Sequence, residues 1–247
     1  MKLTRIVVVL LLLPLFGWAG TFIETFNDDD LKDWQELVRL DKAPGVWEVV
    51  GDELQTVSRE KFVRLLTTGD STWKDYTVEF DVKPLNKHGI GAITIAARVQ
   101  GTWVVLCSIE DPVEFVEGKP PRQREQISCV YGDFHDVIFV RLHAAPHPLL
   151  KLNKWAHLKM RVHNNIFSFS VNEKQVMGPA KMPNLIGVPD FGHFPDFRTG
   201  GVGFGIANYT ARFDNITITG DSVPNKGALP VTQKDKLAIT WGQLKQF

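Results

Sequence analysis

Two stretches of the sequence hold acidic or imidazole side chains that could serve as an acid–base pair. Glu110 is followed directly by Asp111, and Asp133 precedes His135 and Asp136. A carboxylate next to a second carboxylate or an imidazole is the pairing that general acid–base catalysis uses. Charged surface loops show the same spacing, so both interpretations stay open for these two groups.

A second set of residues has the chemistry of a sugar-binding site. Such sites use aromatic rings that stack on the C–H faces of a sugar and planar polar groups that pair with its hydroxyls. Arg98 ends a run in which Ile93 and Ile95 alternate with smaller residues, which predicts that Arg98 lies on the face opposite the isoleucines. The predicted cleft residues are Arg98, Trp103, Glu110, Tyr131 and His135. The alternative is that Trp103 and Tyr131 pack in the core and Arg98 makes a structural ion pair.

The histidines and cysteines match no zinc-site pattern. His143 and His147 have Pro146 between them, so they do not share one face of a helix. The two cysteines, Cys107 and Cys129, lie in apolar runs on either side of a polar, proline-rich insertion. Export would permit a disulfide at the base of that insertion, and two free buried thiols are the alternative.

The composition and the first residues limit the class of protein. The chain has 247 residues, 44% of them hydrophobic, which predicts one large domain with a full core. Its formal net charge of zero gives no indication of a nucleic-acid partner. Lys2 and Arg5, the apolar run 6–16 and the small-x-small site Gly17-Trp18-Ala19 predict a signal peptide over residues 1–19. We expect a secreted, periplasmic or cell-envelope protein with no membrane span in the mature chain, an uncleaved anchor being the alternative.

Short alternating segments predict an all-β fold. Apolar residues occupy every second position of 75–83, which is typical of an antiparallel strand with one buried face. The segment 200–220 reads as two strands joined by a tight turn at Asn208 and Tyr209. Its alternating glycines leave one face bare, so another backbone or a ligand can approach closely. We expect this segment to pair near 22–26 and close a two-sheet antiparallel β-sandwich.

The predicted sandwich domain spans residues 20–220, and residues 221–247 form a linker and a tail. The tail ends in an apolar run around Trp241. Such a run either packs on its own domain or binds a protein partner, and both alternatives stay open.

The order of these pieces resembles the concanavalin A-like lectin/glucanase jelly roll, in its laminin-G-like branch. More narrowly, it resembles the 3-keto-disaccharide hydrolase family of exported proteins. One matching piece is the run Trp-Lys-Asp-Tyr-Thr-Val-Glu-Phe-Asp-Val-Lys at 73–83. The other matching pieces are 22–26, 31–34, 47–54, 154–162, 169–176 and 200–219.

The resemblance implies carbohydrate as the partner and a site on one sheet or at its loop rim. Glucanases of this superfamily carry Glu-x-Asp-x-x-Glu on one strand, whereas Glu79 and Asp81 are followed here by Pro84. The first hypothesis is therefore an exported, non-catalytic carbohydrate-binding module. The second is a hydrolase or lyase acting on a glycoside or 3-keto-glycoside, and the third is a structural or adhesion module of an envelope assembly.

A structural Ca²⁺ that joins the first strand to the last is also implied by the resemblance. The corresponding positions are Glu24, the Gly51–Asp52 turn and Asp214. Their oxygen atoms are the donors that a hard cation prefers. The alternative is that Asp214 caps backbone groups as the last strand begins.

Overall fold

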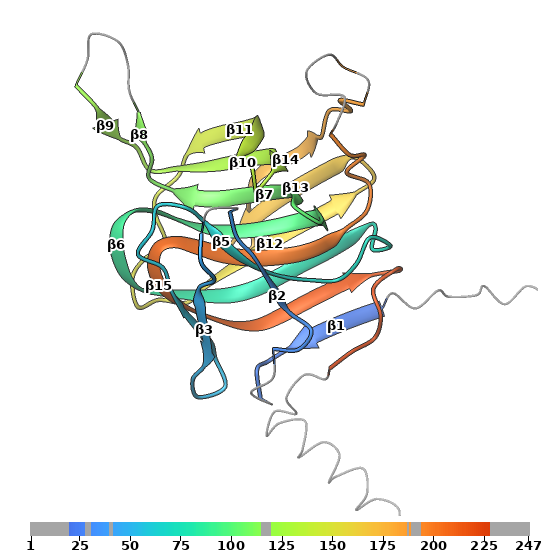
Figure 1. The fold of residues 1–247 in the computed structure, drawn as a ribbon, viewed down its shortest axis with the longest axis horizontal. Coiled ribbons are helices and arrows are strands. Elements are labelled where there is room, and N and C mark those ends of the chain that lie inside the picture. Colours follow the sequence, from blue (N-terminus) through green and yellow to red (C-terminus); the bar gives the residue numbers. More distant parts are fainter. Residues whose placement is uncertain are drawn as a thin grey trace, which may run out of the picture.

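The computed structural model describes residues 20–27, 31–39, 42–114, 120–186, 188 and 194–227. These residues form fifteen β-strands and no helix, and the predicted all-β sandwich is confirmed (Figure 1). Over the described ranges there is therefore no helix long and apolar enough to cross a membrane. Two antiparallel layers share the long strands β6 (Tyr76–Gln100) and β15 (Gly201–Gly220), which run through both.

The halves of β6 and β15 divide the other strands between a first and a second layer. The first layer holds the first half of β6 with β12 (Ala156–His163), β13 (Ile166–Val171), β14 (Lys174–Lys181), β1 (Gly20–Glu24), β4 (Leu54–Val57) and β3 (Val46–Val49). The second layer holds the second half of β6 with β7 (Trp103–Glu110), β10 (Gln126–Asp133), β11 (Ile138–Pro146), β5 (Arg64–Thr68) and β2 (Gln35–Leu37). A separate small sheet pairs β8 (Val113–Glu114) with β9 (Arg122–Gln123).

β15 is one bent strand, so the hairpin predicted for 200–220 is wrong. It pairs with β6 from Gly201 opposite Val99 to Gly220 opposite Tyr76. Asn208 has a φ of 53° and lies where the register shifts. One left-handed residue opposite a continuous partner strand forms a β-bulge, which bends the strand into the other layer without reversing it. Figure 1 shows β6 and β15 curving side by side at the left of the view.

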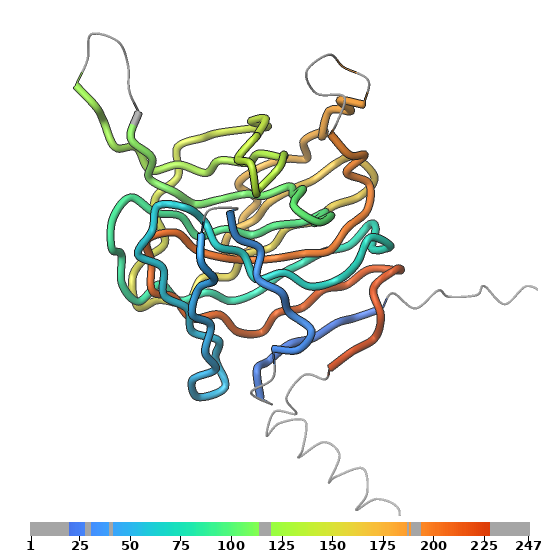
Figure 2. The backbone as a smooth tube through the Cα atoms, viewed as in Figure 1, coloured from blue at the N-terminus to red at the C-terminus, as the bar shows by residue number. Residues whose placement is uncertain are grey.

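The first and last described strands meet, as the sequence predicts. β1 pairs antiparallel with the end of β15, and Phe22 lies opposite Ile218 (Figure 2). The chain then returns along β1, where the Ile23 N–H donates to the Lys226 carbonyl oxygen at 2.8 Å. The described start of the predicted linker therefore packs on the sandwich. The predicted signal peptide and the remainder of the tail lie outside the described residues.

The main core lies between the layers and contains a cluster of aromatic rings. Phe204 of β15 is 1% exposed, and its ring centroid lies 4.6 Å from that of Phe213 and 5.3 Å from that of Phe80. Gly205 faces the other way, and a Cβ there would lie 1.8 Å from the Arg64 carbonyl oxygen of β5. This glycine therefore admits a neighbouring backbone, one of the two alternatives that the sequence left open.

Cys107 and Cys129 lie opposite each other on β7 and β10 and form a disulfide. Both residues are fully buried in the main core. Of the two alternatives, a disulfide or two free buried thiols, the structure has the disulfide. The bridge closes the connection that carries β8 and β9, as a staple at the base of the proline-rich insertion would.

The outer face of the first layer carries a histidine whose contribution to stability depends on pH. His157 Nδ1 lies 2.9 Å from the Asp81 carboxylate, and this hydrogen bond raises the pKa of the imidazole. The pair then stabilises the fold fully below the unfolded-state pKa of about 6.5 and less as pH rises through the folded-state pKa. The hydrogen bond to His157 also lowers the pKa of Asp81, so the carboxylate stays charged at pH values near 6.

We expect His157→Asn to lower the free energy of unfolding by less than about 1 kcal/mol at a pH of about 6, because both partners are partly solvated. At a pH of about 9 the loss should nearly vanish, because the wild-type imidazole is then neutral. Urea denaturation at both pH values measures the difference. His143→Asn, at an exposed position of β11, is the control. Equal losses at the two pH values would contradict this prediction.

Candidate functional site

Alternate side chains of β7 point to the two faces of the second layer. Cys107 and Ile109 pack in the main core, whereas Leu106 belongs to a smaller apolar cluster on the opposite face. Ser108 and Glu110 follow Leu106 at alternate positions of the same strand. The strand therefore presents a carboxylate and a hydroxyl beside apolar surface, away from the main core.

A cleft of about 250 Å³ opens on this outer face of the second layer and is called the Glu110 cleft below. Its aromatic side chains are Phe62, Phe134 and Phe139. Its polar side chains are Arg39, Lys61, Ser108, Glu110 and Ser128. The segment after β2, the loop between β4 and β5, and the turn between β10 and β11 bring these groups to strands β7 and β10.

Glu110 is the one carboxylate among the described side chains that line this cleft. Gln126 Nε2 donates to its Oε1 at 2.9 Å, and the Ser128 hydroxyl is a second hydrogen-bond partner. Burial raises the pKa of Glu110, because these hydrogen bonds and the nearby Arg141 offset only part of the lost hydration. A raised pKa makes a carboxyl group a stronger base than an ordinary glutamate, which suits it to taking up and returning a proton.

Arg39, Lys61 and Phe62 are among the cleft residues that were not predicted from the sequence. The Arg39 guanidinium lies over the Phe62 ring, 3.9 Å from its centroid, and Lys61 Nζ lies 5.2 Å from the same centroid. These residues flank short strands near the start of the chain, far in sequence from Glu110. No local spacing links the two segments, because their proximity depends on the pairing of β5 with β15 and of β15 with β6.

Arg98 lies on the core side of the second layer, so the predicted face is wrong. A register shift between Ala97 and Gln100, with a φ of 56° at Arg98, forms a β-bulge that turns the side chain. The fully buried guanidinium lies 5.4 Å from the centroid of the Tyr76 ring. Its Nη2 donates to the Asn164 carbonyl oxygen at 3.2 Å. Arg98 therefore ties the second layer to the turn between β12 and β13 of the first.

Trp103 and Tyr131 also lie on the core side. The ring centroid of Phe194 is 4.8 Å from that of Trp103 and 5.6 Å from that of Tyr131. Tyr131 is fully buried, and burial raises its pKa. Of the five predicted cleft residues, the structure thus places Glu110 in the cleft and holds Trp103 and Tyr131 together behind it.

Neither predicted acid–base group is paired inside the Glu110 cleft, and His135, whose Nδ1 lies 3.8 Å from Asp136 Oδ1, does not line that cleft. Asp111 does not line the cleft with Glu110, and its carboxylate lies 2.6 Å from Lys87 Nζ. Asp133 accepts a hydrogen bond from the backbone N–H of His135 at 2.8 Å and caps the turn before β11. Both aspartates therefore have local structural partners, and Glu110 is the one acidic side chain among the described residues that line the cleft.

The predicted calcium ligand Glu24 is engaged by protein donors. Its Oε1 accepts from the Phe26 N–H at 2.9 Å, and its Oε2 accepts from the Trp34 indole at 3.3 Å. Among the described residues, no group of three or more His, Cys, Asp or Glu side chains is arranged to hold a metal ion. Each carboxylate oxygen of Glu24 therefore already accepts one protein hydrogen bond.

Asp214 has surroundings that suit a cation better. Burial, and then the carboxylates of Glu53, Asp81 and Asp52, raise its pKa, although the Asn215 N–H donates to it. Gly51 and Asp52 form the left-handed turn between β3 and β4, with φ values of 61° and 59°. Crowded carboxylates are oxygen donors of the kind that Ca²⁺ takes, so calcium at Asp214 and the Gly51–Asp52 turn stays a prediction.

If Ca²⁺ binds there, about 1 mM CaCl₂ should raise the Tm by a few degrees relative to EDTA-treated protein. Differential scanning calorimetry measures this shift. Asp214→Asn should remove the shift, whereas Glu24→Gln should retain it, because Glu24 already accepts two protein hydrogen bonds. An identical Tm in calcium and EDTA would rule the ion out.

Known proteins share this architecture. Among solved structures, the carbohydrate-binding module CBM66 from Bacillus subtilis superposes with a TM-score of 0.56 at 17% identity, over 76% of this chain and 96% of that one. A second Bacillus subtilis protein, described as having a galectin-like fold, superposes with a TM-score of 0.57 at 12% identity, over 82% of this chain and 97% of that one. At these identities the likeness shows the jelly-roll fold. No curated protein matches the chain.

The sequence itself matches one family. The profile of the 3-keto-α-glucoside-1,2-lyase-like domain covers residues 21–219, from β1 almost to the end of β15. The match therefore spans both layers and the strands that form the Glu110 cleft. The chain belongs to the family of 3-keto-α-glucoside-1,2-lyase-like domains, and it is a carbohydrate-related β-sandwich protein.

Proposed function

We propose that this protein is exported and binds carbohydrate in the Glu110 cleft. The observation that carries the proposal is the composition of that cleft, where three phenylalanine rings lie beside two cations, two hydroxyls and a half-buried carboxylate. Aromatic rings stack on the C–H faces of a sugar, and the polar groups pair with its hydroxyls. The family match and the galectin-like fold support the same ligand class.

Binding without catalysis is the simplest function for this cleft. Glycoside hydrolysis by the usual route needs two carboxyl groups about 5–10 Å apart. Glu110 is the one carboxylate that lines the cleft in the described part of the chain. The proposed module therefore recognises a glycan and does not hydrolyse it by that route.

Cleavage of a 3-keto-glycoside is the second candidate function, and the raised pKa of Glu110 favours it. A ketone at C3 acidifies the proton on C2, so one base is sufficient. The carboxylate would take the C2 proton, a C1=C2 double bond would form as the C1–O bond breaks, and the departing oxygen would take a proton. A single carboxyl group whose pKa is raised by burial fits both proton transfers. A hydrolase acting on the same substrates would need water as well.

A glycan array followed by isothermal titration calorimetry tests the first function. Phe62→Ala should weaken binding of any glycan found by about tenfold, because one stacking ring is lost. Ile166→Ala, at an exposed position of β13, should leave binding unchanged. Absence of binding to every glycan on the array would reject the proposal.

Glu110→Gln separates binding from catalysis. The substitution preserves a polar group but removes the base. If the protein is a lyase, the variant should bind a 3-keto-glucoside and release none of its aglycone, which chromatography of the reaction products measures. If wild type also releases nothing, the non-catalytic function stands.

The third hypothesis, a structural or adhesion module, depends on the tail around Trp241. That segment lies outside the described residues. A protein partner for the tail therefore stays a prediction. Deleting residues 228–247 and following the location of the protein in cells would decide whether the tail is needed.

A further inference from the structure

A groove at the end of the sandwich has the composition of a second binding site. It encloses about 660 Å³ between the segment that joins β11 to β12 and the turn that joins β13 to β14. A volume of this size is in the range of small-ligand sites. The groove and the Glu110 cleft have no lining residue in common. The two are therefore separate, and we call this one the Trp155 groove.

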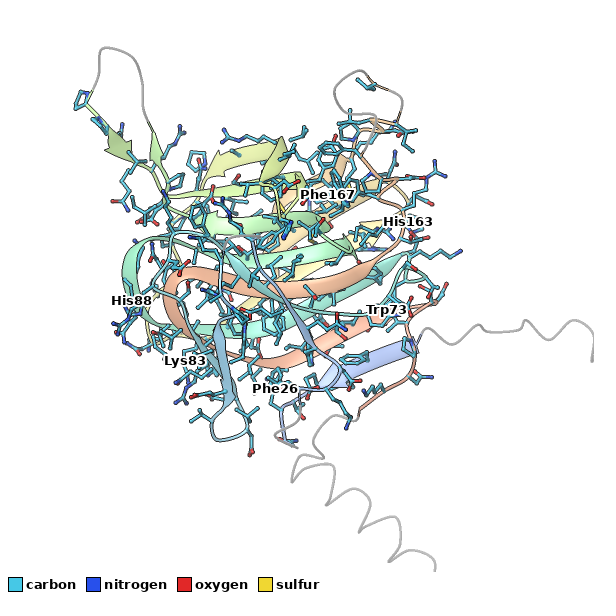
Figure 3. The ribbon with its side chains drawn as sticks, in the orientation of Figure 1. Phe26, Trp73, Lys83, His88, His163 and Phe167 are labelled. Atoms are coloured by element: carbon cyan, nitrogen blue, oxygen red, sulfur yellow. A yellow bond between two sulfur atoms is a disulfide. The ribbon has the colours of Figure 1, made fainter. Side chains whose placement is uncertain are left out.

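Trp155 gives the groove an aromatic surface that the core does not use. It is 42% exposed, and it is the one aromatic residue among the large hydrophobic side chains that the described part of the chain leaves exposed. Lys83 Nζ lies 4.4 Å from the centroid of the indole, and 3.6 Å from Glu53 Oε1. Figure 3 labels Lys83 at the lower left, on the surface of the sandwich. A surface indole beside a groove is a platform on which a sugar ring stacks.

Cationic side chains line the groove, and no carboxylate lines it in the described part of the chain. Lys151, Lys154 and Lys174 are all exposed and line it together with His147. Like charges gathered around one hollow repel each other, and an anion placed among them relieves that repulsion. The groove is therefore complementary to a ligand that carries several negative charges.

Two acidic side chains lie beside the groove and have protein partners: Glu173 follows the lining residue Asn172, and Glu125 bonds to Leu149, which also lines the groove. The Glu173 carboxylate lies 3.6 Å from His157 Nε2, and Glu125 Oε2 accepts from the Leu149 N–H at 3.2 Å. Asn172 accepts from the His157 N–H through its Oδ1 at 2.9 Å, which leaves its side-chain NH₂ as a donor. The groove thus offers hydrogen-bond donors and positive charge around one stacking surface.

We propose that the Trp155 groove binds an acidic glycan, a chain containing uronic acids. One sugar ring stacks on Trp155, the carboxylates pair with Lys151, Lys154 and Lys174, and the Asn172 amide donates to a hydroxyl. A neutral glycan would leave the lysines unpaired. Nucleic acid fits less well, because the groove has one exposed ring and the chain has no excess of positive charge.

Isothermal titration calorimetry with oligogalacturonate, alginate oligomers and hyaluronan oligomers tests this inference. Methyl-esterified oligogalacturonate is the matched ligand control, because esterification masks the charge and keeps the sugar rings. At least one acidic chain should bind, more tightly than the esterified chain by about tenfold or more, and its affinity should fall as salt is added. Absence of binding to all three acidic chains, or equal binding of the esterified chain, would overturn the proposal.

Variants locate the site. Trp155→Ala should weaken binding by about tenfold, and the combined change of Lys151, Lys154 and Lys174 to glutamine should abolish it. Lys181→Gln, at an exposed lysine of β14 outside the groove, is the matched control and should bind like wild type. These side chains are exposed, so thermal unfolding should show the same Tm in every variant. The proposal would be contradicted if Trp155→Ala bound the acidic chain as tightly as wild type does. It would also be contradicted if single-stranded DNA competed for the groove as well as the acidic glycan does.

This site is independent of the proposed function. Glu110→Gln and Phe62→Ala should leave the affinity for acidic chains unchanged, because neither residue lines the Trp155 groove. Loss of acidic-chain binding in these two variants, with Trp155→Ala unaffected, would assign the acidic glycan to the Glu110 cleft and reject the second site.

Discussion

Phe204→Ala is expected to lower the free energy of unfolding by about 3–5 kcal/mol, the usual result of deleting a fully buried aromatic ring. Phe204 lies at the centre of the main core, with ring centroids of Trp34 at 5.2 Å, Phe80 at 5.3 Å and Phe213 at 4.6 Å. These rings come from the first β-layer and from the chain segment before β2, so the cavity would loosen several elements at once. Denaturation in guanidinium chloride measures the loss.

The matched control for this cavity is Val46→Ala on β3, where the side chain is 54% exposed. It should change the free energy of unfolding by less than about 0.5 kcal/mol, as surface substitutions usually do. If Phe204→Ala were as mild as Val46→Ala, the layers would not be held together by this aromatic cluster.

Removing the disulfide is the second large change. Cys107→Ala combined with Cys129→Ala should lower the free energy of unfolding by about 3 kcal/mol, because the bridge closes a segment of 22 residues and restricts the unfolded chain. Alanine is chosen because both positions are fully buried and a serine hydroxyl there would need a hydrogen-bond partner. Urea denaturation of oxidised wild type and of the double variant measures the difference in the free energy of unfolding.

Reductant supplies the control for the bridge. Unfolding in dithiothreitol should shift the midpoint of wild type towards that of the double variant and leave the double variant unchanged. If dithiothreitol left the unfolding midpoint of wild type unchanged, and if the double variant unfolded at that same midpoint, the bridge would contribute nothing to stability.

Local sequence patterns determined the strands and many of their turns. Alternation of apolar residues along 75–83 predicts the buried side of the first half of β6, where Tyr76, Val78, Phe80 and Val82 all pack in the main core. The Asn172–Glu173 turn has left-handed φ values of 49° and 63°, as a two-residue hairpin requires. These features depend on contacts between neighbours in the chain, so sequence alone reveals them.

The bulges at Asn208 and Arg98 were not predictable in the same way. A single left-handed residue reverses a chain when no partner strand continues past it, and only bends the chain when one does. Which outcome applies at Asn208 depends on β6, whose paired residues lie more than a hundred positions earlier in the chain. At Arg98 the bulge turns the side chain to the face opposite the predicted one, so the guanidinium lies in the core and not in the cleft predicted from the sequence.

The sequence by itself determined an all-β chain, its family and one acidic residue of the cleft, because alternation, motif order and residue type are local properties. Only the tertiary structure decided which groups meet Glu110 and which surround Trp155. Arg39 and Phe62 reach the cleft through strand pairings between distant segments, and Lys174 reaches the groove through the β13–β14 turn. Which distant residues lie close together in a sandwich depends on sheet register and on bulges, and a short stretch of sequence does not determine either.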